Sequence, residues 1–389
     1  MYLRLLNPLL SQSFFLFGPR GTGKTSSLRG LLPPEKREEI DLLNSQLANS
    51  YLVGPRGFHQ HLESLPERID WVVIDEVQKV PALLDVVHQC IESTGPLSRL
   101  KFALTGSSAR KLKRGGANLL AGRAFLNNLH PLTHRELGED FNLEHALRFG
   151  TLPKLFQLQQ IEEKKEFLRT YAQTYLKEEV KEEQLVRRLE PFIKFLEVAA
   201  QCNGTVLNFS KMGRDVGTDQ KAIERYFEIL QDTLLGFFLQ PFHFSVRRRT
   251  IQKAKFYFFD PGVKRALENT LSVPLTEGYS IGRAFEHFVI LELHRFNDYL
   301  RKDFRFSYLR TKDGAEIDLI VERPGQSRVL VEIKSSKAVD PTDVRKFARI
   351  AKIIPNSKPI ILCQEPLPRV QEKVRILPWQ MGIEEILEV

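Results

Sequence analysis

The chain has 389 residues, enough for two or three domains of ordinary size, and its 57 Lys and Arg against 48 Asp and Glu give a net charge of +9. This basic balance indicates an anionic partner, a nucleic acid or a membrane surface, unless it is only the charge of a basic soluble protein. The cysteines, Cys90, Cys202 and Cys363, form no closely spaced pair, which excludes a disulfide framework or a thiolate zinc site and favours a reducing cytoplasm.

The amino terminus is apolar but does not read as a targeting segment. Asn7 and Pro8 interrupt its apolar stretch, and the following residues run directly into a phosphate-binding motif. Cleavage there would destroy that motif, and no apolar run in the chain has the length of a membrane span. We therefore expect a cytoplasmic protein without a signal peptide and without a membrane partner.

Three short apolar runs predict buried strands near the amino terminus. They cover residues 14–17, 71–75 and 102–105, and a helical pattern at residues 81–92 lies between two of them. Strands that are apolar on both faces and alternate with helices are typical of a parallel sheet covered on both sides. The amino-terminal region is therefore predicted to be an α/β domain.

The first of these strands leads into a nucleotide-binding motif. The segment GPRGTGKT at residues 18–25 follows the strand and precedes a helix, as the G-x-x-x-x-G-K-[ST] pattern requires. Glycines let the backbone wrap a phosphate, while the loop amides and the helix N-terminus attract the anion. Lys24 is expected to reach the β and γ phosphates of ATP, and Thr25 to hold Mg²⁺. The predicted binding residues are Gly18, Pro19, Arg20, Gly21, Thr22, Gly23, Lys24, Thr25 and Ser26.

Two carboxylates follow the second apolar strand. Asp75 is expected to bind Mg²⁺, directly or through water, and Glu76 to act as the general base that polarises the attacking water. At the end of the third strand, Ser107 and Ser108 are the candidates for sensing the γ-phosphate, with a simple polar turn as the alternative. This arrangement predicts ATP hydrolysis.

A basic, glycine-rich stretch comes next and ends at Arg123. Since Arg123 immediately precedes another strand-like run, it is our candidate for an arginine that contacts ATP, in the same chain or across a subunit interface. A solvated basic loop is the alternative. The trans arrangement would make the protein a homo-oligomer.

The middle of the chain predicts helices and a hairpin. Residues 136–190 are charged and helical, which suggests a lid or linker, and residues 191–270 predict a winged helix. In it a short helix, residues 210–216, ends at Gly217, a second helix follows, and strands at 234–239 and 256–259 form the wing. Lys221, Arg225 and Gln220 project from the outward face of the second helix. The DNA phosphates are expected to meet the basic cluster between the two strands, which comprises Arg247, Arg248, Arg249, Lys253 and Lys255. A winged helix used only for packing is the alternative.

The carboxyl-terminal region carries acidic residues on two predicted strands. Glu316 and Asp318 share one face of the strand at residues 316–321, and Glu332 and Lys334 share one face of the strand at residues 329–333, with helix 282–296 upstream. An Asp followed by Glu-x-Lys on the next strand is the pattern of the PD-(D/E)xK nucleases. Glu286, Asp318 and Glu332 are the predicted Mg²⁺ ligands, and Lys334 the catalytic lysine. A hairpin with ordinary salt-bridging charges, and a nuclease-like fold that holds DNA without cutting it, are the alternatives.

The order of these motifs resembles a known family over nearly the whole chain. The motifs GPRGTGKT, VVIDEVQKVP, LTGSSARKL, LAGR, TYLKEEV, FYFFDPGV, GRAFEHFV, GAEID and EIK are similar to those of prokaryotic AAA-type ATPases that carry a winged helix and a carboxyl-terminal nuclease-like domain of unknown function. The resemblance implies an AAA-type P-loop ATPase domain at residues 1–135, a helical lid or linker at 136–190, a winged-helix domain at 191–270 and a small α/β restriction-endonuclease-like domain at 271–389.

The expected function is that of an ATP-dependent DNA-binding ATPase. It would act on duplex or branched DNA, with weak sequence preference, in repair, recombination or defence, with ATP and Mg²⁺ as cofactors. The alternative is an ATP-regulated signalling or scaffold protein whose nuclease-like domain is inactive.

Overall fold

The computed structural model describes residues 2–107, 120, 122–175, 189–243, 254–275, 279–311 and 314–388. These fall into two compact units. The first unit comprises Met1–Leu132, Leu152–Lys154 and Asp232–Leu235, and the second Thr133–Thr151, Leu155–Gln231 and Gly236–Val389. Among the helices in these described ranges, none combines the length and the apolarity of a bilayer span.

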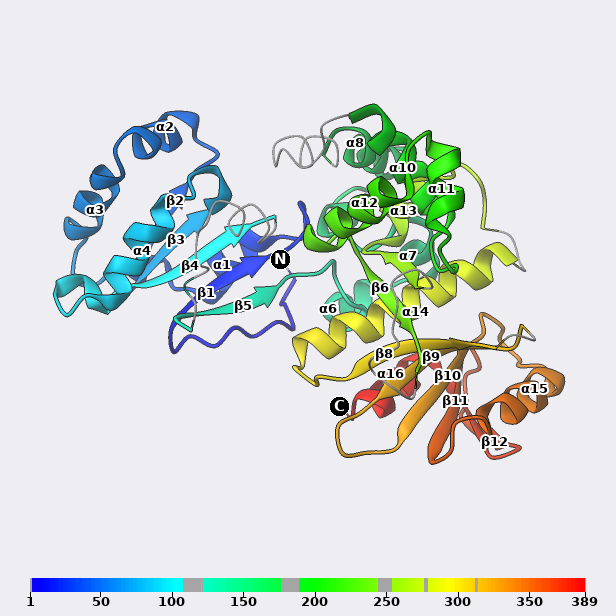
Figure 1. The fold of residues 1–389 in the computed structure, drawn as a ribbon. Coiled ribbons are helices and arrows are strands. Elements are labelled where there is room, and N and C mark those ends of the chain that lie inside the picture. Colours follow the sequence, from blue (N-terminus) through cyan, green and yellow to red (C-terminus); the bar gives the residue numbers. More distant parts are fainter. Residues whose placement is uncertain are drawn as a thin grey trace. The chain divides into compact units, whose positions relative to one another are not determined.

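The first unit is built on a sheet whose described strands are all parallel (Figure 1). The order across the sheet is β2 (Arg37–Asp41), β3 (Trp71–Asp75), β4 (Lys101–Gly106), β1 (Ser13–Phe17) and β5 (Ala124–Asn128). This confirms the predicted parallel sheet. Because all carboxyl ends meet at one edge, the loops after β1, β3 and β4 lie next to one another, with β4 between the other two.

Helices cover both faces of this sheet. They are α1 (Lys24–Leu31), α2 (Ser45–Val53), α3 (Pro55–Glu63) and α4 (Leu83–Glu92). Alternate strand residues point to opposite faces, so Phe15 and Phe17 belong to one apolar cluster, while Phe14 and Leu16 belong to another on the far side. Burial on both faces explains the continuous apolar runs in the sequence.

The second unit begins with helices. These are α6 (His134–Leu137), α7 (Leu143–Phe149), α8 (Ile161–Thr170), α10 (Leu189–Gln201), α11 (Phe209–Val216), α12 (Gln220–Asp232) and α13 (Pro261–Leu267). The turn between α11 and α12 follows from its residues. Gly217 adopts φ 81°, the Asp219 carboxylate accepts a hydrogen bond of 2.8 Å from the Ala222 amide, and a Cβ on Gly213 would lie 2.7 Å from the Thr218 carbonyl oxygen.

A mixed sheet forms the rest of the second unit. Its described strands are β12 (Arg369–Gln371), β13 (Val374–Pro378), β11 (Ser357–Cys363), β10 (Arg328–Ile333), β9 (Glu316–Glu322), β8 (Arg305–Arg310), β6 (Gly236–Pro241) and β7 (Lys255–Phe258), in that order. The predicted hairpin is present, since β9 and β10 pair antiparallel with Val321 opposite Val329. The antiparallel pair β6–β7 joins the same sheet because β6 pairs with β8.

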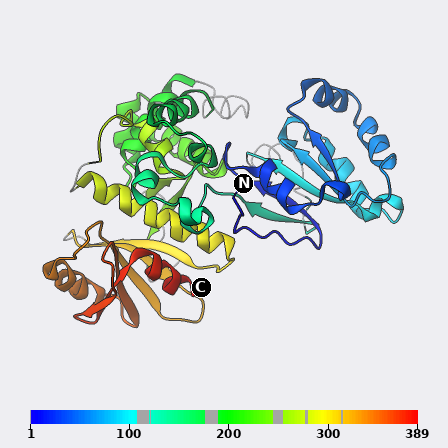
Figure 2. The same cartoon turned by 180° about the vertical axis from the view of Figure 1, so that it is seen from behind.

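Three further helices pack on this second sheet. The long helix α14 (Tyr279–Tyr299) runs across it, as Figures 1 and 2 show from opposite sides. Helix α15 (Pro341–Ala351) buries Val344 and Phe347 in the cluster that contains Leu330. Helix α16 (Trp379–Leu387) lies on the other face, where its Gly382 lies close to Leu362. The sheet is therefore covered on both faces, and α14 and β7 approach the acidic ends of β9 and β10.

Candidate functional site

The loop between β1 and α1 has the geometry of a phosphate cradle. Gly21 and Gly23 adopt φ of 79° and 90°, which L-residues with side chains rarely reach. A Cβ on Gly18 would lie 2.4 Å from the Leu129 carbonyl oxygen, so this position also requires glycine. Helix α1 begins at Lys24, and its free amides therefore open into the loop.

Two basic side chains hold this loop in shape. The ammonium of Lys24 is buried and donates to the carbonyl oxygen of Gly18 at 2.8 Å. From outside, Arg4 donates to the Thr22 carbonyl oxygen at 2.7 Å and to the His130 carbonyl oxygen at 2.6 Å. Arg4 was not predicted from the sequence, because its role depends on a contact with a residue far along the chain.

The side chains of Thr25 and Asp75 meet at the carboxyl edge of the sheet. The Thr25 hydroxyl donates to Asp75 Oδ2 at 2.7 Å, and the Thr105 hydroxyl donates to the other carboxylate oxygen. A hydroxyl and a carboxylate in contact beside a phosphate loop are the oxygen donors that Mg²⁺ prefers. These residues therefore fit the predicted magnesium ion: Thr25 and Asp75 would hold it, and its charge would offset part of the negative charge of the ATP phosphates.

The next residue, Glu76, is held in position by a side chain that the sequence analysis did not single out. Glu76 adopts φ 58°, and its amide donates to Thr105 Oγ1 at 3.2 Å. The side-chain amide of Gln78 donates to the Glu76 carboxylate, and lies 3.5 Å from the hydroxyl of Ser107. Gln78 thus connects the candidate base with the candidate γ-phosphate sensor, and its place two residues after Glu76 is the signal that would have identified it. Ser108 lies outside the described residues.

Arg123 lies at the end of the same sheet where the strands begin, opposite the end that carries the phosphate loop. Strands β1 and β5 are parallel, with Ser13 opposite Ala124, so Arg123 precedes the amino end of β5 while the phosphate loop follows the carboxyl end of β1. Its guanidinium donates to the Glu92 carboxylate. An Arg123 contact with ATP would therefore have to be made across a subunit interface.

A second group of charged side chains lies where β9 and β10 meet. Asp318 accepts a hydrogen bond of 2.8 Å from the Ile333 amide, and Lys334 Nζ lies 2.9 Å from Glu332 Oε1. Burial, followed by the charges of Glu332 and Glu286, raises the pKa of Asp318 well above its usual value. Burial also raises the pKa of Glu332, against the opposing effect of Lys334. The structure therefore brings together all the residues predicted for a nuclease-like centre.

Two residues of β7 that were not assigned to this centre complete the group. Lys255 is 3% exposed, and its ammonium lies 2.5 Å from Glu316 Oε1 and 3.6 Å from Glu286 Oε1. The hydroxyl of Tyr257 donates to Glu286 Oε1 at 2.7 Å. Lys255 had been predicted to contact DNA, and in the structure it faces carboxylates instead.

The Mg²⁺ ligand set Glu286, Asp318 and Glu332 stays a prediction. Nowhere in the described part of the chain do three or more His, Cys, Asp or Glu side chains form a group that could hold a metal ion. Glu286 is engaged by Tyr257 and Lys255, while Asp318 binds a backbone amide. The side chains thus have the chemistry of metal ligands, but not their arrangement.

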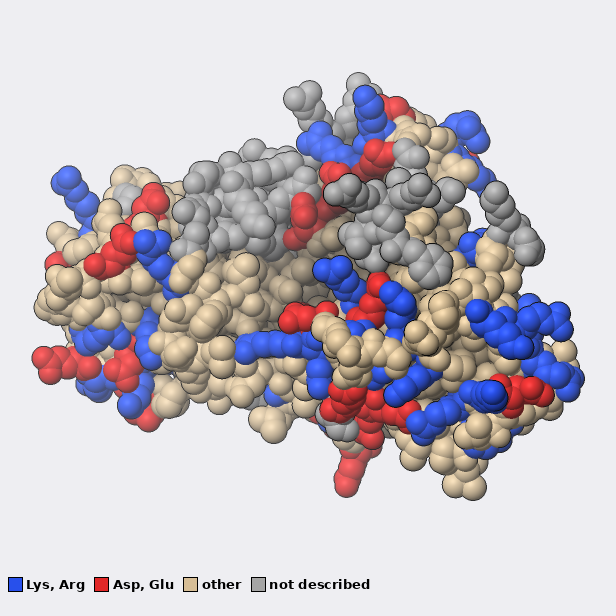
Figure 3. Space-filling view, turned by 60° about the horizontal axis from the view of Figure 1, so that its bottom comes forward, with Lys and Arg blue, Asp and Glu red and all other residues tan. Residues whose placement is uncertain are grey.

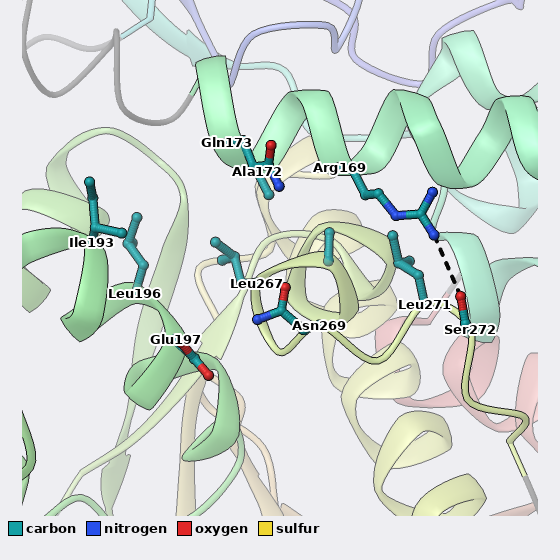
Figure 4. A pocket seen from close by; sticks show the side chains of 11 residues that line it. Arg169, Ala172, Gln173, Ile193, Leu196, Glu197, Leu267, Asn269, Leu271 and Ser272 are labelled. Atoms are coloured by element: carbon teal, nitrogen blue, oxygen red, sulfur yellow. Dashed lines mark hydrogen bonds between the residues drawn. The ribbon is translucent and has the colours of Figure 1, made fainter.

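A separate cavity of about 380 Å³ lies in the second unit (Figure 4). It is an open pocket lined by α8, α10, α13 and the residues that follow α8 and α13, and the Arg169 guanidinium lies 3.5 Å from the hydroxyl of Ser272. Its walls combine apolar side chains such as Leu196 and Leu271 with polar ones such as Gln173 and Glu197. No predicted site residue lines it, so it is distinct from both charged centres.

Three family models match successive parts of the chain. Residues 11–138 match an AAA domain, residues 140–273 a domain of unknown function, DUF8612, and residues 281–381 another domain of unknown function, DUF4143. An uncharacterized protein of Mycobacterium tuberculosis is 26% identical over 314 residues, which cover 80% of this chain and 68% of that protein. An uncharacterized protein of Methanocaldococcus jannaschii is 22% identical over 282 residues, 67% of this chain and 59% of that protein.

Solved structures give weaker similarity. The ORC1 protein of Aeropyrum pernix, solved in complex with DNA, matches with a TM-score of 0.30 and 11% identity, covering 67% of this chain and 86% of that one. A signal transduction ATPase of Pyrococcus horikoshii with a tetratricopeptide repeat sensor has a TM-score of 0.24 and 13% identity, covering 75% and 48%. Scores this low do not establish a shared fold. The AAA model and the geometry of the phosphate loop together show that the chain contains an AAA-type ATPase domain.

Proposed function

We propose that this protein hydrolyses ATP with Mg²⁺ and couples the cycle to DNA binding, in repair, recombination or defence. The observation that carries the ATPase half is the contact between Thr25 and Asp75 at 2.7 Å, beside the phosphate loop. Here Lys24 would bind the β and γ phosphates, Thr25 and Asp75 would hold Mg²⁺, and Glu76 would take the proton of the attacking water. Ser107 would contact the γ-phosphate.

The DNA half of the proposal is supported by the helices α10 to α12 and the β6–β7 hairpin. This is the order of elements in a winged helix, with α12 as the helix that would meet DNA. Lys211, Arg214, Lys221 and Arg225 are exposed on α11 and α12. These cations favour contacts with phosphates, which give weak sequence preference. Arg247, Arg248, Arg249 and Lys253 lie outside the described residues.

The carboxyl-terminal part offers a further basic surface to the same partner. Helix α15 exposes Arg345, Lys346 and Arg349, with Lys352 just beyond it. Figure 3 shows Lys and Arg side chains, mixed with Asp and Glu, on the face that includes this helix.

We also propose that the chain is divided into an ATPase domain at 1–135, a lid or linker at 136–190, a winged helix at 191–270 and a nuclease-like domain at 271–389, and that the protein is cytoplasmic.

DNA is expected to bind in a salt-dependent manner and to stimulate ATP hydrolysis. Changing Lys221 and Arg225 together to Ala should weaken binding to all sequences alike and lower the salt dependence, because fewer counterions are released. The measurement is ATPase rate and DNA affinity with duplex, single-stranded and four-way junction DNA across a salt series. Lys194→Ala, an exposed lysine on α10, is the matched control.

The same assay distinguishes the alternative function. An ATPase rate that no form of DNA changes, together with no binding at low salt, would contradict the DNA half of the proposal. It would favour an ATP-regulated signalling or scaffold protein whose nuclease-like domain is inactive.

Arg123 is expected to act between subunits. Arg123→Ala should lower the rate of hydrolysis at least about tenfold and leave ATP binding intact. The reason is that the guanidinium would stabilise the charge of the transition state and not that of bound ATP. Mixing Arg123→Ala with Glu76→Gln should restore part of the activity, since a neighbour would supply the missing arginine. Glu92→Gln, which removes the salt-bridge partner of Arg123, is the control for a purely structural role. A monomer with full activity would refute the assignment.

A further inference from the structure

The cluster of carboxylate side chains at β9 and β10 includes lysine side chains from the same chain. Glu286 and Glu316 both lie beside Lys255, and the charge of Glu286 raises the pKa of both Asp318 and Glu332. Lys334 lies between Glu332 and Asp343, at 2.9 and 3.8 Å, so its charge is shared with a carboxylate from α15. A second cation beside Glu286 and Glu316 would lower the cost of gathering these carboxylates next to the more buried Asp318 and Glu332.

Lys255 supplies that cation from a distant part of the chain. It is among the least exposed lysines of the described residues, at 3%, while Glu286 and Glu316 remain 22% and 31% exposed. Its position is fixed by the backbone, since β7 pairs with β6 and β6 pairs with β8. Two residues on, Tyr257 points to the same face and donates to Glu286.

We propose that the ammonium of Lys255 is the resident cation of this group and takes the place of a divalent metal ion. The carboxyl-terminal domain would then contact DNA without cutting it, a conclusion that rests on the nuclease-like assignment but is independent of the ATP site. The arrangement explains why potential metal ligands converge without forming a group of three that could hold an ion among the described residues. A lysine and a metal ion would compete for Glu286 and Glu316.

The proposal predicts that removing Lys255 creates a metal site. The full-length protein, free of nucleotide, is titrated with Mn²⁺ alone and followed by calorimetry, electron paramagnetic resonance and thermal unfolding. Lys255→Met should gain one Mn²⁺ site, at least about tenfold tighter than any in the wild type, and Mn²⁺ should raise its Tm. Adding Asp318→Asn should abolish the gain. Mn²⁺ bound near the phosphate loop should be the same in all variants, so it does not contribute to the difference in Mn²⁺ binding between them.

Two results would overturn the proposal. One is a folded Lys255→Met protein with no new Mn²⁺ site. The other, which needs no change at Lys255, is a wild-type Mn²⁺ site that Asp318→Asn removes. If Lys255→Met does not fold, the comparison of wild type with Asp318→Asn still decides the question.

Cleavage assays give a second readout. Wild-type protein with Mg²⁺ or Mn²⁺ should leave linear, circular and four-way junction DNA intact. Cleavage that both Asp318→Ala and Lys334→Ala abolish would show a working metal centre and refute the role of Lys255. DNA-stimulated ATPase is measured on the unmodified protein, so a failure of the proposed function would appear separately, as an absence of stimulation there.

Discussion

Glu76→Gln is expected to reduce ATP hydrolysis by about 10²- to 10⁴-fold while ATP binding stays within about twofold of the wild type. The change removes the carboxylate that would accept a proton from the attacking water but keeps the size of the side chain. Gln78 donates to this carboxylate, so the variant loses one charged acceptor and little else of the local structure. Hydrolysis at the wild-type rate would show that Glu76 is not the base.

Lys24→Ala provides the complementary result in the same experiment. It should abolish ATP binding, because the ammonium both attracts the phosphates and donates to the Gly18 carbonyl oxygen that shapes the loop. Phosphate release and binding of a fluorescent ATP analogue are measured together. Lys36→Ala, a half-exposed lysine of the same unit paired with Asp70, is the matched control and should bind and hydrolyse normally.

The amino-terminal sheet could be predicted where its strands are buried on both faces. β1, β3 and β4 are continuous apolar runs, and the structure has strands at each of them. β2 could not be predicted, because it lies at the edge of the sheet and its sequence, REEID, buries only Ile40. A charged edge strand has no hydrophobic pattern from which to recognise it.

The residues of the candidate sites also differ in whether the sequence alone could predict them. The phosphate loop residues and Asp75 and Glu76 are contiguous in sequence, so a local motif indicates them. Arg4 and Lys255 act through contacts with residues 130 and 316, which depend on how separate strands pair. No local pattern contains that information. For the same reason, the sequence indicated metal ligands on β9 and β10 but not the lysine from β7 that lies beside them.

The second unit contains a buried ionic network that was likewise not predicted. Glu292 and Arg295 on α14 are 0% and 1% exposed. The Arg295 guanidinium donates to the Phe259 carbonyl oxygen at 2.9 Å, to Thr151 Oγ1 at 3.0 Å and to Glu292 Oε1 at 3.3 Å. The other Glu292 oxygen accepts the His134 amide at 3.0 Å. These bonds connect α6, the segment after α7 and the segment before α13 to the long helix.

Arg295→Met is therefore expected to lower the free energy of unfolding of the second unit by about 3–5 kcal/mol, because it removes the guanidinium that pairs with the buried Glu292 carboxylate and leaves that carboxylate with only the His134 amide and ring beside it. Glu292→Leu combined with Arg295→Met should recover part of that loss, since removing both charges costs less than leaving one unpaired. Urea unfolding followed by fluorescence is the measurement, with Arg349→Met on the exposed face of α15 as the control, expected within about 0.5 kcal/mol of the wild type. A single variant as stable as this control, or a double variant less stable than Arg295→Met alone, would show that the pair is not the coupled buried unit described.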